Sequence, residues 1–126
     1  ERLGYSCMND DKLLEAFALM DAALAECDAD PDNSLRQAAL AKTFETTFEY
    51  LWKYFKREAD KAGLETYSPR DALKAAAQLQ MIDDLELWNR FLNARNLSVH
   101  DYVGMDQEGA VNLVRQCRDS VKQLIG

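Results

Sequence analysis

The chain has 126 residues, 48% of them hydrophobic, with only two prolines and five glycines. That length is enough for one domain with its own hydrophobic core, and the scarcity of proline and glycine favours long helices. No apolar stretch is long enough to span a membrane, and the N-terminus lacks the pattern of a signal peptide. The net charge of −7 argues against a generally basic nucleic-acid-binding surface, so any RNA site must be a local basic patch.

The three cysteines and the single histidine argue against a structural zinc site. Cys7, Cys27 and Cys117 are scattered, odd in number and not in metal-ligand spacing. Such cysteines are typical of a reducing compartment, so we expect a cytoplasmic protein. No cofactor motif appears, and we expect neither a cofactor nor a bound metal.

Residues 1–9 show no periodicity, and we expect a flexible N-terminal segment or foreign or upstream sequence before a natural start at Met8. Residues 10–126 then form a single domain. Asp10 is the expected N-cap of a first helix. Apolar residues recur along that helix at every third or fourth position: Leu13, Phe17, Met20, Leu24 and Cys27. Proline and aspartate in residues 28–33 end it in a turn.

A second, longer helix is expected over residues 34–62, with Ser34 as its N-cap and Gly63 as its stop. Its predicted core stripe consists of Leu40, Phe44, Phe48, Leu51 and Phe55. Three further aromatic residues lie on other faces of this helix: Tyr50, Trp52 and Tyr54. They indicate either a central helix packed on two sides or an aromatic surface that meets a partner subunit.

The third helix is expected over residues 69–79, because Ser68 can cap it and Pro69 suits its first position. Arg70 is then either a solvated first-turn residue or a second phosphate contact. A fourth helix starts at Asp83 or Asp84. Residues 101–107 form a loop before the last helix, whose predicted stripe is Val111, Val114, Val121 and Ile125.

These patterns predict an all-α fold, an antiparallel up-and-down bundle of four to five helices. No segment alternates like a strand, and no glycine-rich phosphate loop or internal repeat appears. Grouped carboxylates for two-metal catalysis are lacking too, since the nearest candidates, Asp83 and Asp84, are expected to cap a helix.

Residues 91–102 hold the strongest candidate site. His100 is the only histidine, and histidine is the side chain best suited to acid–base chemistry near neutral pH. Arg95 carries the planar, permanently charged group that binds phosphate through two oxygens. On an ideal helix Arg95 lies in the middle of an apolar arc, formed by Trp88, Phe91, Leu92 and Val99. It is either a functional arginine or a structural one paired with a carboxylate of a neighbouring helix.

The pattern Arg95-Asn96-x-x-x-His100-x-Tyr102 resembles the Arg-x4-His-x-Tyr signature of the HEPN superfamily. It is similar in particular to the nucleotidyltransferase substrate-binding family, the HEPN half of the two-gene MNT–HEPN toxin–antitoxin modules. Two further motifs support the resemblance, Phe44-Glu45-x-x-x-Glu49-x-x-Trp52-Lys53 and Ser68-Pro69-Arg70. It covers the chain from about Leu13 to Ile125.

The resemblance implies a homodimer in which both arginine–histidine pairs face a shared cleft. It implies a toxin that cleaves RNA without metal, with a ribose 2′-hydroxyl attacking the adjacent phosphate. His100 would then be the general base or acid, and Arg95 would stabilise the phosphorane. Asn96 would hold the imidazole or the phosphate, and Glu45 or Glu49 would orient Arg95 or His100.

The family also implies a regulatory partner. A cognate minimal nucleotidyltransferase would attach adenylate to Tyr102 and block RNA by bulk and negative charge. One alternative is a non-catalytic subunit that presents a nucleotide or substrate to that separately encoded nucleotidyltransferase. A helical dimer without any nucleotide role is a third. We expect no DNA and no membrane among the partners.

Overall fold

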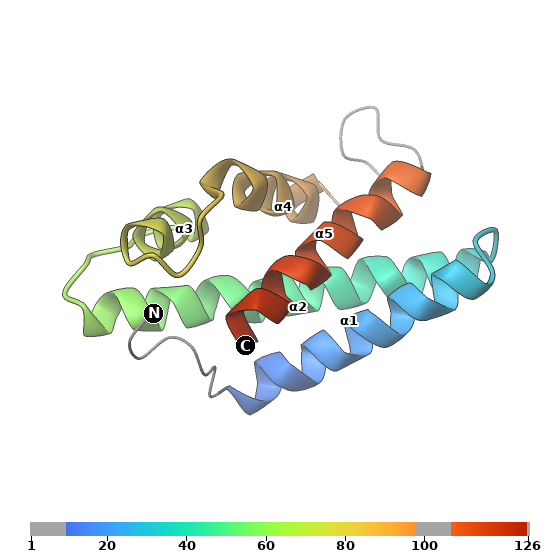
Figure 1. The fold of residues 1–126 in the computed structure, drawn as a ribbon, viewed down its shortest axis with the longest axis horizontal. Coiled ribbons are helices and arrows are strands. Elements are labelled where there is room, and N and C mark those ends of the chain that lie inside the picture. Colours follow the sequence, from blue (N-terminus) through green and yellow to red (C-terminus); the bar gives the residue numbers. More distant parts are fainter. Residues whose placement is uncertain (1–9, 98–106, 126) are drawn as a thin grey trace.

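The computed structural model describes residues 10–97 and 107–125, and within these two ranges the only regular secondary structure is α-helix (Figure 1). The five helices are α1 Asp11–Ala29, α2 Ser34–Lys61, α3 Pro69–Gln78, α4 Leu85–Leu97 and α5 Gln107–Ile125. The predicted all-α bundle is therefore confirmed. The expected flexible segment, residues 1–9, lies outside the described residues.

Helix α2 is the centre of the bundle. Figure 1 shows α1 along one side of α2, and α3 and α4 on the opposite side, with α5 crossing the bundle obliquely. Helix α2 accordingly packs against α1, α3 and α4, whereas α5 packs against α1 and α4. Of the three additional aromatic residues of α2, Tyr54 is buried and Tyr50 and Trp52 are half-buried. The interpretation of a central helix packed on more than one side is confirmed.

The side chains that begin α1 and α3 were identified correctly. The Asp10 carboxylate accepts a hydrogen bond from the Leu13 backbone N–H at 3.1 Å, and the Ser68 hydroxyl accepts one from Asp71 at 3.1 Å. Such N-caps satisfy backbone donors that have no partner within the helix. The N-termini of α1 and α3 are thus determined by the capping residues that directly precede them.

Two helix starts differ from the prediction. Asn33, not Ser34, caps α2, because its side-chain oxygen accepts hydrogen bonds from both Leu35 and Arg36. Ser34 is the first helical residue. Helix α5 already begins at Gln107, which was assigned to the preceding loop. Of the two aspartates proposed to start α4, Asp84 is the cap, accepting from the Leu87 N–H at 3.0 Å.

The predicted core positions of α1 and α2 are all buried. In α5 the prediction is confirmed for Val114 and Val121, which are buried, whereas Val111 and Ile125 are only half-buried. The buried face of α5 also includes Leu113, Cys117 and Leu124. The α1–α2 contact also contains a buried polar bond, from the Thr47 hydroxyl to the Ala16 carbonyl at 3.0 Å. It satisfies the hydroxyl inside the core.

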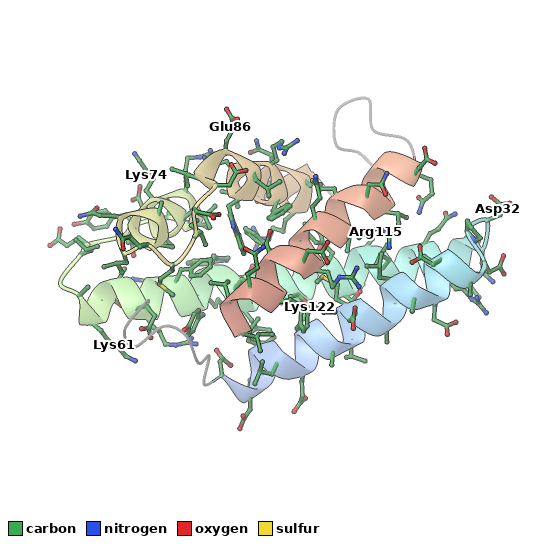
Figure 2. The ribbon with its side chains drawn as sticks, in the orientation of Figure 1. Asp32, Lys61, Lys74, Glu86, Arg115 and Lys122 are labelled. Atoms are coloured by element: carbon green, nitrogen blue, oxygen red, sulfur yellow. The ribbon has the colours of Figure 1, made fainter. Side chains whose placement is uncertain are left out.

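Helix α5 is linked to α1 by a bidentate ion pair. The Arg115 guanidinium donates to both carboxylate oxygens of Asp28, at 2.9 and 3.0 Å. These bonds hold the pKa of the Asp28 carboxyl below its usual range. Arg115 projects from the side of α5 (Figure 2), and its pair with Asp28 helps to fix this oblique helix against α1.

Helices α2 and α3 end in the same way, with a residue in the left-handed conformation. Gly63 has φ 78°, and the Leu64 N–H bonds the Ala59 carbonyl at 2.9 Å. At the end of α3 the equivalent residue is Gln80, with φ 63°. Glycine adopts this conformation without the steric cost that a side chain brings.

We therefore expect Gln80→Gly to raise the free energy of unfolding by about 0.5–1 kcal/mol, because it relieves that cost at an exposed position. Urea unfolding followed by circular dichroism measures the change. The converse substitution at the end of α2, Gly63→Gln, is expected to destabilise by a similar amount. Equal stabilities for Gln80→Gly and the wild type would contradict the argument.

Candidate functional site

An open groove of about 610 Å³ lies between α2 and the C-terminal half of α4. Helix α2 lines it with Lys42, Glu45, Thr46, Glu49, Tyr50 and Lys53, and α4 contributes Arg95 and Asn96. The arginine of the candidate motif thus faces a hollow that is wide enough for a small ligand. We call it the Arg95 groove.

Arg95 is held at the edge of the core by partners on two sides. Its guanidinium forms an ion pair with Glu49 of α2, and its Nη1 donates to the Asn96 side-chain oxygen at 3.0 Å. The Arg95 side chain is 25% exposed and that of Glu49 32%. Because a guanidinium has five N–H donors, these partners fix its orientation and leave donors for a phosphate in the groove.

The structure distinguishes between the two glutamates that were expected to orient the site. Glu49 contacts Arg95, and it also lies 3.5 Å from the Lys53 ammonium group. Glu45 instead pairs with Lys42, at 3.1 Å. One carboxylate is therefore shared between the two cations nearest the motif. The ion pair with a neighbouring helix is compatible with both interpretations of Arg95, functional and structural.

The groove is locally basic although the protein is acidic. Three cations line it, Lys42, Lys53 and Arg95, against the two carboxylates of Glu45 and Glu49. Phosphate groups bind where positive charge and hydrogen-bond donors converge. Three cations against two carboxylates leave the lining a net charge of +1, with each cation ion-paired to Glu45 or Glu49.

Arg70 is not part of this groove. Its Nη2 donates to the Asn93 side-chain oxygen of α4 at 3.2 Å, and Asn93 is not among the residues that line the groove. The structure thus does not bring Arg70 together with Arg95. A phosphate contact of Arg70 would therefore belong to a different surface.

Sequence reasoning missed three lining residues, Lys42, Thr46 and Tyr50. The signal for them was present, because Lys42 precedes Glu45 by three residues and Thr46 precedes Glu49 by three. Tyr50 follows Thr46 by four residues, on the same face. Extending the face of α2 around those glutamates in both directions identifies them.

His100 and Tyr102 lie outside the described residues, and their roles remain predictions. Among residues 10–97 and 107–125 no group of three or more histidine, cysteine, aspartate or glutamate side chains is placed to hold a metal ion. Burial raises the pKa of the Cys117 thiol. No helix in the same two ranges is long and apolar enough to cross a membrane.

Comparison with known proteins identifies a family. A family model described as "nucleotidyltransferase substrate binding protein like" matches residues 9–124. A search of curated proteins finds no match. The matched range includes every residue of the Arg95 groove.

Proposed function

The chain belongs to the nucleotidyltransferase substrate binding protein-like family, and on this premise we propose that it is a metal-independent ribonuclease of the HEPN toxin type. The observation that carries the proposal is the Arg95 guanidinium, oriented by Glu49 and Asn96 at the wall of a locally basic groove. An arginine held in this way is suited to binding the phosphate that is cleaved.

The proposed chemistry is an internal transfer at phosphorus. The ribose 2′-oxygen bonds to the adjacent phosphorus while the bond to the 5′-oxygen breaks, giving a 2′,3′-cyclic phosphate. His100 takes the proton from the 2′-hydroxyl or gives one to the leaving oxygen. Arg95 stabilises the negative charge that develops on the phosphorane oxygens. Asn96 and Glu49 are positioning residues, since both contact the guanidinium.

The uneven charge distribution accommodates an RNA substrate on an acidic protein. Helix α1 carries five carboxylates and one lysine. Residues 69–97, which form α3, α4 and their connection, carry four basic and four acidic residues, and these helices lie on the opposite side of α2 from α1 (Figure 1). The negative electrostatic potential that repels RNA is therefore strongest at α1, away from the Arg95 groove.

The proposal includes regulation and assembly. A cognate minimal nucleotidyltransferase in the cytoplasm adenylylates Tyr102, which adds bulk and charge two residues from His100. Two chains form a homodimer whose Arg95 grooves face a shared cleft. Light scattering at micromolar concentration should give the mass of a dimer, and a monomer would overturn this part.

A second candidate function is a non-catalytic subunit that binds a nucleotide or substrate for the separately encoded nucleotidyltransferase. The description of the matched family and the net charge of −7 favour it. In this case Arg95 and the two lysines of the groove hold a phosphate group without breaking any bond.

Incubation of purified protein with RNA in excess EDTA distinguishes the two functions, once mass spectrometry has excluded adenylate on the protein. We expect cleavage by the wild type and loss of it in Arg95→Gln. The matched control is Arg57→Gln, which removes an exposed arginine paired with Asp10 away from the groove. No cleavage by the unmodified wild type, combined with nucleotide binding that depends on Arg95, would favour the binding subunit.

A further inference from the structure

A second cluster of cations lies outside the Arg95 groove. Arg70 and Lys74 project from α3, and Arg90 projects from α4, and all three are exposed. We call this surface, on the outside of the α3–α4 hairpin, the basic face. Figure 2 shows that Lys74 and Glu86, from α3 and the first turn of α4, both point away from α2.

One hydrogen bond fixes how the two helices place these cations. Arg70, in the first turn of α3, bonds Asn93 in the second half of α4, so the hairpin is antiparallel. Lys74 lies one turn further along α3, and Arg90 lies about one turn before Asn93 on α4. The three cations therefore gather on one face of the hairpin.

The cations of the basic face form no ion pair with a carboxylate of the described residues. Nine lysines and arginines elsewhere among the described residues form ion pairs, whereas Arg70, Lys74 and Arg90 form none there. Of the nearest acids, Asp71 accepts a hydrogen bond from the Tyr67 backbone N–H at 3.0 Å. Glu65 and Glu86 are also close to these cations along the chain, and among the described residues neither is within ion-pair distance of Arg70, Lys74 or Arg90.

An exposed aromatic ring lies at the end of this face. Tyr67 precedes Arg70 by three residues and is 82% exposed, the largest exposure among the large hydrophobic side chains of the described residues. Its backbone is tied to Asp71 of α3. Single-stranded RNA is commonly bound by cations that follow the phosphates and aromatic rings on which bases stack.

Helix α4 connects the basic face with the Arg95 groove. Arg90 and Arg95 are about 7.5 Å apart along the helix axis and about 140° apart around it. They therefore lie on two different sides of the same helix. An RNA strand that leaves the Arg95 groove and crosses α4 would first meet Arg90. It would then meet Arg70 and Lys74, the cations of α3.

We propose that the basic face is a second RNA-binding surface, where Arg70, Lys74 and Arg90 contact phosphates of the strand held in the Arg95 groove and Tyr67 stacks on one base. This inference rests on the proposed function, because it extends the path of the same RNA. An acidic protein is the less suitable partner, since protein interfaces usually have an apolar centre and the residue that Arg70 bonds on α4, Asn93, is polar.

Fluorescence anisotropy with a labelled 2′-O-methyl RNA of about 12 nucleotides tests the proposal without cleavage, because this RNA has no attacking hydroxyl. The variant is K74Q/R90Q. Its matched control is K12Q/K122Q, which also removes two exposed cations that form no ion pair among the described residues. Melting temperatures of both variants check the fold.

We expect K74Q/R90Q to lower the RNA affinity about tenfold at ~100 mM salt, and K12Q/K122Q to lower it less than about twofold. The slope of log affinity against log salt should fall by about 1.4 in the first variant, about 0.7 for each phosphate that is no longer neutralised. Tyr67→Ser should weaken binding about fivefold or more, and the equally exposed Leu35→Ser should not. Glu86→Gln should strengthen binding.

Arg95→Gln separates the two proposals in the same assay. If it weakens RNA binding while K74Q/R90Q behaves like K12Q/K122Q, the basic face is wrong and the groove stands. If Arg95→Gln leaves the affinity unchanged, the groove is wrong. Binding of polyglutamate in place of RNA, sensitive to K74Q/R90Q, would assign the basic face to an acidic protein and overturn the inference.

Discussion

Replacing His100 by alanine is expected to lower the rate of RNA cleavage by about 10²–10⁴-fold, the usual contribution of a general acid or base. The RNA affinity should change less than about threefold, because the charge that binds phosphate comes from Arg95 and the lysines of the groove. Single-turnover cleavage in EDTA gives the rate, and anisotropy with the 2′-O-methyl RNA gives the affinity.

Tyr102→Phe is the control for this experiment, since it changes the same short segment and removes only a hydroxyl. It should cleave RNA like the wild type and should no longer accept adenylate from the partner nucleotidyltransferase. Undiminished cleavage by His100→Ala would show that another group moves the proton. Equal losses of cleavage and affinity would make His100 a binding residue.

Replacing Trp88 by alanine is expected to cost about 3–5 kcal/mol of stability, as removal of a large buried aromatic side chain generally does. Trp88 is 2% exposed. Its ring centroid lies 5.3 Å from that of Phe91, 5.4 Å from Phe55 and 6.4 Å from Phe48. It therefore joins α4 to the central helix α2, on which the Arg95 groove depends.

A domain of this kind is stabilised by about 5–15 kcal/mol in total, so Trp88→Ala should be partly unfolded at 37 °C or unfold at a much lower urea concentration. Leu19→Ala is the control, because Leu19 is 64% exposed and its loss should cost less than about 0.5 kcal/mol. Equal urea midpoints for the two variants would contradict the role of Trp88 in the core.

The sequence predicted those features that depend on neighbouring residues of the same helix. The apolar spacing identified the buried faces of α1 and α2, and Asp10 and Ser68 were recognised as caps because a cap bonds backbone groups two or three residues away. At Asn33-Ser34 two good capping residues adjoin. Local preference is nearly equal there, and the path of the α1–α2 turn decides which one caps the helix.

Arg95 illustrates what a helical wheel cannot predict about burial. The helical wheel placed it in the middle of an apolar arc, and yet the side chain is 25% exposed. A wheel gives the angle of a residue around its own helix and says nothing about which neighbouring helix covers that angle. Near Arg95 the neighbour is a polar stretch of α2, and the space between them is the groove.

The sequence by itself determined the all-helical class, because helical periodicity is encoded in short-range spacing. The resemblance of its motifs indicated the family, which the family match then showed, and the roles of Arg95, His100 and Tyr102 stay predictions. Only the tertiary structure decided that Glu49 and not Glu45 contacts Arg95. These glutamates are one helical turn apart, about 6 Å, so the choice between them depends on how α2 and α4 are set against each other. That packing involves residues 46 positions apart in the chain, a separation beyond the reach of any local pattern.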